Sequence, residues 1–155
     1  MQKVCQRCVL DARIELITLV PMQVLRTVES LAQYRDAALV PTMGGLHDGH
    51  LSLVRTAGLE TGPVVVSIFV NPSQFEPGED LESYPRDFER DLELIRPFAD
   101  LVFAPEAETI YPAGFSSYID VGPVACILEG EARLAHFRGV ATGVAKTSRG
   151  EPAHL

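Results

Sequence analysis

The sequence lacks the features of a membrane-spanning or secreted protein. No apolar run approaches the roughly 18 residues that a membrane span needs, and the longest, around residues 64–70, has the length of a strand. The three cysteines are an odd number, with Cys5 and Cys8 in a C-x-x-C and Cys126 alone, which is no disulfide framework. Residues 1–21 hold no apolar stretch long enough for a signal peptide. These absences predict a cytoplasmic protein with no membrane partner.

Lysine is also scarce. The chain has 13 basic and 21 acidic side chains and a formal net charge of −8 at pH 7, and its lysines are Lys3 and Lys146 alone. Nucleic-acid binding depends chiefly on clustered basic groups that face phosphates. We therefore expect no nucleic-acid partner, and an anionic ligand has to be held locally, by backbone N–H groups, histidines and single arginines.

The remaining composition is that of one folded domain. The chain has 155 residues, of which 46% are apolar and 22% charged. Apolar spacing predicts helices over residues 22–31, 50–59 and 86–97, and buried strands over residues 37–40, 64–70 and 101–104. In the helix at 86–97, Phe88, Leu92 and Ile95 form the expected core face beside the acidic Glu89, Asp91 and Glu93. Strands that alternate with helices predict a doubly wound α/β sheet, with ligands beyond the carboxyl ends of its strands.

The pattern is weaker after Pro105. We expect a short strand over residues 117–121, a further apolar segment over 124–128, a loop over 129–139 and the start of a helix over 140–146. Residues 147–155 are polar and contain Gly150 and Pro152, so no compact element is expected there. The predicted compact part of the chain therefore ends near residue 146.

Two histidines lie where the first strand's loop meets a helix. His47 and His50 are three residues apart, so both rings can point the same way from the helix's first turn. Unpaired N–H groups and the positive end of the helix dipole favour a phosphate there, and two imidazoles can donate to its oxygens. A chance pair on a polar loop, or two ligands of a metal site that lacks a third, would have the same spacing. The pair alone leaves these three interpretations open.

The residues around this pair resemble a known family. The run from Leu39 to Arg55, with T-M-G-G-L-H-D-G-H, is similar to the nucleotide-binding motif of the pantothenate synthetases, also called pantoate–β-alanine ligases. Residues 66–75, with F-V-N-P-S-Q-F, resemble that family's pantoate-site segment. Further blocks match in the same order, namely residues 100–105, 111–112, 128–130 with Arg133, and 136–142. The resemblance extends over roughly residues 22–146, and the second motif is particular to this family.

This resemblance implies an ATP-dependent ligase with a Rossmann-like fold of the HxGH nucleotidyltransferase type. Such an enzyme condenses (R)-pantoate with β-alanine through a pantoyl adenylate and yields pantothenate, AMP and pyrophosphate. The adenylate supplies the leaving group that a free carboxylate lacks, while the protein positions the reactants and stabilises phosphate charge. The implied partners are ATP as a substrate, Mg²⁺ to share the phosphate charge, the small molecules pantoate and β-alanine, and a second copy in a homodimer.

The resemblance also implies roles for individual residues. The ATP site would be lined by Met43, Gly44, Leu46, His47, Asp48, Gly49 and His50. His47 and His50 would be catalytic at the phosphates, with His50 as proton donor, and Gln74 would hold pantoate and then β-alanine, because an amide both donates and accepts. No residue is assigned to a metal. The resemblance would also place Arg133, His136 and Arg138 close to the site. From the residues alone, these three are typical of solvated loops, Met43 could only pack and Gln74 could cap a loop.

The sequence also departs from the family pattern. The family continues, after the segment that matches residues 140–146, with a lysine motif that contacts ATP, a second pantoate-binding glutamine and a C-terminal lid, none of which is found here. Gly45 replaces a bulkier residue, and Cys5 and Cys8 supply two ligands where a structural zinc needs four.

The expected organisation is a non-family extension over residues 1–21, which makes Met22 a candidate start, an incomplete Rossmann-like domain over 22–146 and a divergent tail over 147–155. We expect this chain alone to be an inactive or partial form of the ligase. The alternative hypothesis is a non-catalytic nucleotide-binding protein derived from it.

Overall fold

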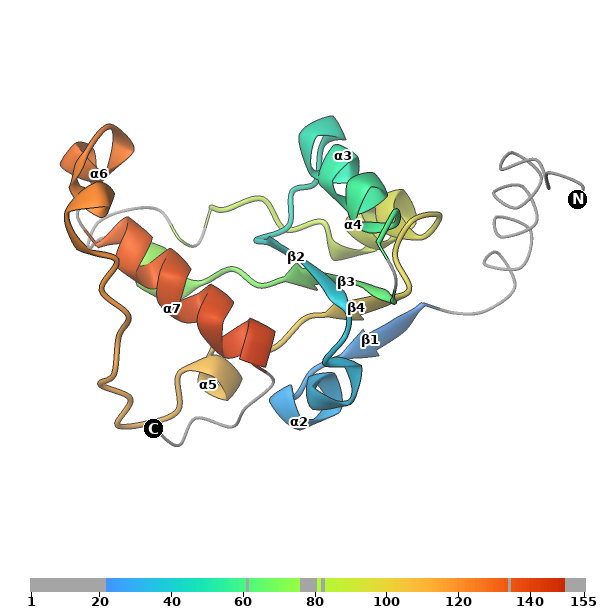
Figure 1. Cartoon of the computed structure of the whole chain (residues 1–155), viewed down its shortest axis with the longest axis horizontal. Helices are drawn as coiled ribbons and strands as arrows, with labels where there is room; N and C mark the ends of the chain where they lie inside the picture. The colour runs from blue at the N-terminus through green and yellow to red at the C-terminus, as the bar shows by residue number, and fades with distance from the viewer. Residues whose placement is uncertain (1–21, 61, 76–80, 82, 134, 150–155) are drawn as a thin grey trace, which may run out of the picture.

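A four-stranded parallel sheet organises the molecule. The computed structural model describes residues 22–60, 62–75, 81, 83–133 and 135–149, so the extension with Cys5 and Cys8 and the residues after 149 lie outside the described part. The strands follow the spatial order β1-β4-β3-β2, and helices cover both faces of the sheet (Figure 1). This arrangement confirms the predicted α/β class.

The central strands are buried on both faces. The strands are β1 (Gln23–Leu25), β2 (Ala38–Thr42), β3 (Val64–Ile68) and β4 (Leu101–Phe103). β3 lies between β2 and β4, with Ala38 opposite Val64 and Val65 opposite Leu101. Helices cover both faces of a parallel sheet, so every side chain of a central strand is buried. The sequence of such a strand is therefore a continuous apolar, β-branched run, such as Val64 to Val66.

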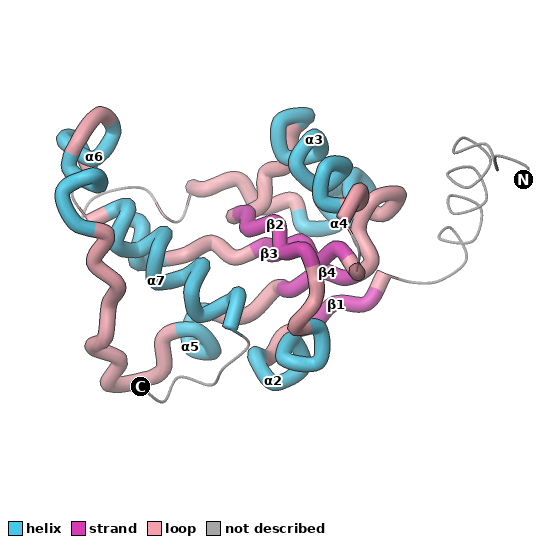
Figure 2. Tube along the Cα trace, viewed as in Figure 1, coloured by secondary structure: helices cyan, strands magenta, loops and turns pink. Residues whose placement is uncertain are grey.

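Successive residues of β3 point to opposite faces of the sheet and so belong to two core clusters. Val64 and Val66 pack with residues of α3 (Asp48–Ala57) and α4 (Phe88–Ile95) on one face. Val65 packs on the other face with residues of α2 (Val28–Leu31) and α5 (Ala107–Ile110). Figure 2 shows these helices on either side of the strands. The predicted doubly wound architecture is therefore present.

The N-terminal helix expected over residues 22–31 is wrong. Gln23–Leu25 is an edge strand that pairs with β4, and only Val28–Leu31 is helical, followed by the 3₁₀ helix η1 (Ala32–Tyr34). Thr27 begins this short helix, since its hydroxyl accepts a hydrogen bond from the Ser30 N–H at 3.3 Å. The apolar spacing is helical, but in the structure residues 23–25 pair with β4, and this strand buries Leu25.

Pro41 does not stop its strand. β2 continues through Pro41 to Thr42, which lies opposite Ile68. Proline lacks a backbone N–H group and cannot donate a hydrogen bond to a neighbouring strand. It is tolerated here because β2 lies at the edge of the sheet and has a neighbouring strand on one side only. The strand therefore delivers Thr42 and Met43 to the carboxyl end of the sheet.

The C-terminal part is more helical than expected. Residues 117–121 form no strand, and Gly122–Cys126 is the 3₁₀ helix η3. Most of the loop expected over 129–139 is replaced by α6 (Glu129–Ala132) and the start of α7 (His136–Arg149), which contains the helix expected over 140–146. Glycine at 139 and 143 disfavours a helix in sequence, but both glycines let α7 approach the 3₁₀ helix η2 (Pro72–Gln74) and Asn71 closely.

Among the described residues, no helix combines the length and apolarity that crossing a membrane requires.

Candidate functional site

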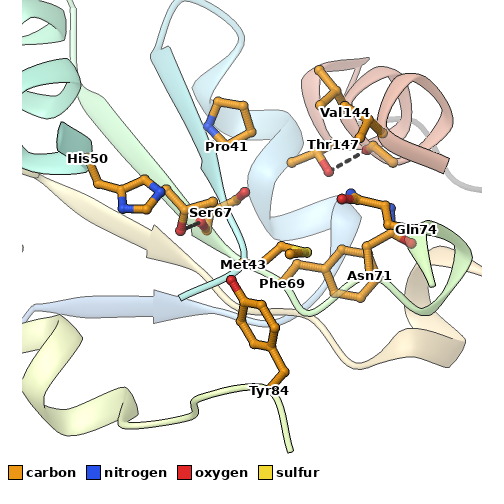
Figure 3. A pocket seen from close by; sticks show the side chains of 13 residues that line it. Pro41, Met43, His50, Ser67, Phe69, Asn71, Gln74, Tyr84, Val144 and Thr147 are labelled. Carbon is orange, nitrogen blue, oxygen red and sulfur yellow. Dashed lines mark hydrogen bonds between the residues drawn. The ribbon is translucent and has the colours of Figure 1, made fainter. Parts of the chain in front are cut away.

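A cavity of about 250 Å³ opens at the carboxyl ends of β2 and β3 (Figure 3). The turn after β2, the segment after β3, α3 and α7 all contribute to its wall. The lining residues are Pro41, Thr42, Met43, His50, Ser67, Phe69, Asn71, Gln74, Tyr84, Val140, Gly143, Val144 and Thr147. Three residues predicted for the site, Met43, His50 and Gln74, therefore line one cavity, at the end of the sheet where ligands were expected.

Polar groups approach this cavity from several sides. His50 lies on one side, Gln74 and Asn71 lie on the opposite side, and the hydroxyl of Tyr84 lies between them (Figure 3). Phe69 and Val144 add apolar surface to the wall. A mostly apolar cavity with a few convergent polar groups is typical of a small-molecule site.

His47 caps the helix that carries His50. Its backbone is extended, and its Nδ1 accepts a hydrogen bond from the Gly49 N–H at 3.1 Å. Because Nδ1 is the acceptor, the neutral ring carries its proton on Nε2. The His47 and His50 ring centroids are 4.2 Å apart, so the two histidines are adjacent as their spacing predicted.

The Nδ1 atom of His50 is buried and has no hydrogen-bond partner within the described part of the chain. Burial lowers the pKa of His50 below its usual 6.5, the nearby His47 lowers it further, and Asp91 partly opposes this. The ring is therefore neutral at pH 7 and presents a nitrogen without a partner. Such an atom is costly in a folded protein unless a ligand or water satisfies it.

The lowered pKa of His50 predicts a pH-dependent stability. The unfolded chain binds more protons than the folded one between the folded pKa and the unfolded value of 6.5, so the folded state loses stability as the pH falls through this window. We expect the urea midpoint of the wild type to decrease more between pH 7.5 and pH 5.5 than that of His50→Gln. Identical pH profiles for the two proteins would contradict this expectation.

A buried carboxylate holds the turn that leads to these histidines. Asp91 in α4 is 2% exposed, and its oxygens accept hydrogen bonds from the N–H groups of Gly45 at 2.9 Å and Leu46 at 2.8 Å. The helical spacing predicts Asp91 beside the core face, and the sequence alone indicates no role for it. The sequence feature that indicates its burial is its spacing. Asp91 lies three residues after Phe88 and four before Ile95, which puts it on the buried side of the helix.

Asn71 connects the Gln74 segment to α7. It is 1% exposed, its amide donates to the Gly139 carbonyl at 3.0 Å, and its Oδ1 accepts from the N–H and the hydroxyl of Ser73. The Ser73 hydroxyl in turn bonds Tyr111 at 2.9 Å. This network anchors η2, whereas in the sequence Asn71 is recognisable only as part of the F-V-N-P-S-Q-F motif.

Two basic side chains after residue 130 also contact this segment. Arg133 donates to the Gln74 carbonyl at 3.3 Å, and His136 Nδ1 lies 3.2 Å from the same oxygen. The interpretation of these two as solvated loop residues is therefore wrong, because they help to place Gln74. Arg138 is exposed and stacks over Tyr118, with its guanidinium carbon 4.4 Å from the ring centroid.

The other residues predicted for the ATP site lie outside the cavity wall. His47, Asp48 and Gly49 are exposed at the start of α3. Gly44 is buried, and Leu46 is 7% exposed and packs in the core with α3 and α4. The structure thus brings Met43 and His50 to the cavity and leaves the start of α3 as an exposed surface beside it.

The interpretation of the two histidines as metal ligands gains no support. Over the described ranges, no group of three or more histidine, cysteine, aspartate or glutamate residues could hold a metal ion. Asp91, a carboxylate close to the turn, uses both oxygens on backbone N–H groups. The described residues therefore offer the pair no third protein ligand of these types.

A parallel α/β sheet, an H-x-G-H turn at a helix start and a cavity at the strand ends together define a fold of the nucleotidyltransferase type. The family model described as Pantoate-beta-alanine ligase matches residues 17–149. The chain belongs to this family, and the resemblance stated from its motifs is confirmed.

Individual relatives agree with this assignment. Pantothenate synthetase from Roseiflexus sp. (strain RS-1) is 56% identical over 131 residues, which cover 81% of this chain and 47% of the relative. The enzyme from Gluconobacter oxydans (strain 621H) is 54% identical over 130 residues, with the same two coverages. The chain therefore spans about half the length of the curated relatives it matches.

Solved structures agree as well. Pantothenate synthetase from Thermus thermophilus has a TM-score of 0.75 and 49% sequence identity, over 81% of this chain and 47% of that one. Pantoate-beta-alanine ligase from Francisella tularensis, described as complexed with beta-gamma ATP and beta-alanine, has a TM-score of 0.72 and 36% identity, over 81% of this chain and 52% of that one. The fold of the family is therefore present in the described part of the chain.

Proposed function

We propose that this chain provides the phosphate-binding and pantoate-binding half of a pantoate–β-alanine ligase. The observation that carries the proposal is the cavity that places His50, from the H-x-G-H motif, opposite Gln74, from the F-V-N-P-S-Q-F motif. Two substrates that react with each other have to be bound side by side. A nucleotide motif and an acid-binding motif on one cavity meet that requirement.

In the first step, an oxygen of the pantoate carboxylate attacks the α-phosphorus of ATP, and the bond from that phosphorus to the bridging oxygen breaks. The products are pantoyl adenylate and pyrophosphate. In the second step, the amine of β-alanine attacks the acyl carbon, loses a proton and displaces AMP. The chemistry is mainly positioning and charge stabilisation.

The cavity suits pantoate. The Gln74 amide can donate to the carboxylate and accept from a hydroxyl, and the hydroxyl of Tyr84 offers a further polar contact. Phe69, Val140 and Val144 provide apolar wall for the two methyl groups of pantoate. Arg133 and His136 act indirectly. They contact the backbone carbonyl oxygen of Gln74 and so hold in place the backbone from which the Gln74 side chain extends.

The start of α3 suits the phosphates. The helix N-terminus is the positive end of its dipole, and His47 Nε2–H is free of its capping bond, which uses Nδ1. His50 contributes the buried nitrogen without a partner and, when protonated, would donate a proton to the leaving pyrophosphate. ATP as a substrate is further supported by the nucleotide named for the Francisella tularensis relative.

Mg²⁺ is part of the expected reaction, where it would neutralise charge on the phosphates. The described residues do not fit a protein-built magnesium site, since they contain no metal-binding group of three side chains and Asp91 is fully bonded to the backbone. Magnesium commonly keeps several waters and is held by substrate phosphates. No step proposed above is therefore assigned to a protein-bound metal.

The organisation, assembly and location of the chain also remain proposals. We retain an extension over residues 1–21 and a Rossmann-like domain that begins at residue 22. We place the end of this domain at or after the end of α7 at Arg149, because Thr147 is 4% exposed and so belongs to the packed part of the chain.

A homodimer is supported by exposed apolar side chains between Tyr118 and Leu128, such as Val124, which is 71% exposed. The cysteine pattern favours the cytoplasm.

Calorimetric titration of the 155-residue chain with ATP and with pantoate tests the proposal. Both ligands are expected to bind, His50→Ala should weaken ATP, and Gln74→Ala should weaken pantoate but leave ATP binding unchanged. The exposed Glu60→Gln serves as the control. ATP binding without any pantoate binding or pantoate-dependent pyrophosphate release would favour the non-catalytic alternative, and failure of both ligands to bind would overturn the proposal.

A further inference from the structure

The turn between β2 and α3 forms a backbone cradle for an anion. Gly44 and Gly45 both have positive φ, +84° and +63°, a conformation that glycine adopts without strain. This turn aims the successive N–H groups of Gly45 and Leu46 at one point, where they meet the carboxylate of Asp91. Concavities of successive N–H groups commonly bind phosphates in proteins.

In this chain the cradle is already filled. The two carboxylate oxygens of Asp91 each accept one N–H, at 2.9 Å and 2.8 Å, and the residue is 2% exposed. Such charge-assisted bonds are about twice as strong as bonds between neutral groups. A phosphate oxygen therefore cannot reach the N–H groups of Gly45 and Leu46 without displacing Asp91.

Rigid elements hold Asp91 in this position. Its neighbour Leu92 is 8% exposed and Ile95 is fully buried, so α4 is packed into the core. A methyl group at Gly44 would lie only 3.0 Å from Asp91 Oδ2, so the absence of a side chain at this position lets the turn approach the carboxylate closely. The carboxylate thus connects α4 to the turn that determines where α3 and its two histidines begin.

We propose that Asp91 is a positioning residue that occupies this anion cradle and so directs the nucleotide phosphates to His47 and His50 instead of to the glycine turn. The role in phosphate binding rests on the proposed function, whereas the occupation of the cradle does not. In the ligand-free chain, Asp91 holds the turn. When the nucleotide binds, the N–H groups of Gly45 and Leu46 remain with Asp91.

Backbone amide NMR spectra of the 155-residue chain test the cradle without any nucleotide. In Asp91→Ala, added formate should titrate the amide signals of Gly45 and Leu46, because a small carboxylate can enter the vacated cradle, while the same signals in the wild type should not respond. Asp91→Asn, which keeps the shape, should move both amide protons upfield even if Asp91→Ala does not fold. Equal responses to formate in both proteins, or no shift in Asp91→Asn, would overturn the proposal.

Titration with ATP then tests the second half. In the wild type the signals of His47 and His50 should move more than those of Gly45 and Leu46, and Asp91→Asn should weaken ATP binding about tenfold, the effect of losing one charged hydrogen bond. Glu89→Gln, an exposed carboxylate of the same helix, is the matched control and should leave ATP binding unchanged. Larger shifts at Gly45 and Leu46 than at the histidines would overturn the role of Asp91. If ATP moves no signal at all while the formate result holds, the proposed function fails and the cradle assignment stands.

Discussion

Gly139→Ala is expected to destabilise the protein by about 3 kcal/mol, the upper end of what inserting a methyl group into a packed contact costs. A Cβ atom at this position of α7 would collide with the Ser73 carbonyl and lie 2.9 Å from the Gln74 nitrogen. Backbone atoms cannot rotate away as a side chain can, so α7 and η2 have to separate. That separation also strains the bond from Asn71 to the Gly139 carbonyl.

Because η2 carries Gln74, the same substitution is expected to weaken pantoate binding. Urea unfolding measures the loss of stability, and titration with pantoate measures the effect on the site. Gly58→Ala is the matched control, since Gly58 ends α3 with φ of −67° and its added methyl group would meet the nearest atom, the Arg55 carbonyl oxygen, at an ordinary 3.4 Å. A midpoint for Gly139→Ala equal to that of Gly58→Ala would show that α7 does not need a glycine at this contact.

His50→Ala is expected to lower the rate of pantoate-dependent pyrophosphate release by about 10²–10³-fold, the effect of removing one donor to the charge that develops in the transition state. The substitution removes the buried nitrogen that has no partner among the described residues, so the stability of the folded chain should change little or rise. Loss of activity without loss of stability is expected of a residue that destabilises the ligand-free protein and whose polar atom is satisfied only when a ligand is bound.

The rate is that of pantoate-dependent pyrophosphate release, the first of the two proposed steps. Folding is checked by urea unfolding at pH 7.5. His47→Ala provides an informative comparison. It removes a helix cap and should therefore lower stability by about 1 kcal/mol as well as weaken phosphate binding. An unchanged rate in His50→Ala would remove His50 from the reaction, whatever the affinity for ATP.

Several parts of the fold were predicted correctly because they depend on local patterns. The run Val64 to Val66 predicts a strand buried on both faces, and the spacing of Leu51 and Val54 predicts one amphipathic face of α3. The positions of His47 and His50 relative to a strand end and a helix start follow from the same local signals. The two motifs around His50 and Gln74 were sufficient to predict the family.

Contacts between distant residues required the tertiary structure. Gln23 is extended because it lies opposite Leu101 in the sheet, although its neighbours have helical spacing. Gly139 and Gly143 occur in a helix because Ser73, Gln74 and Asn71 need the space of their missing side chains. In each case a long-range contact outweighs a local preference of at most about 1 kcal/mol per residue.

The sequence by itself therefore determined the α/β class, the H-x-G-H turn and the membership of the ligase family, because apolar periodicity and motifs are properties of neighbouring residues. Only the tertiary structure decided that Gln74 and His50 share a cavity and that Asp91, 46 residues beyond Gly45, fills the cradle of the turn. A carboxylate on an amphipathic helix has the same local pattern whether it contacts water or a buried backbone, and only the packing of α4 against the sheet distinguishes the two.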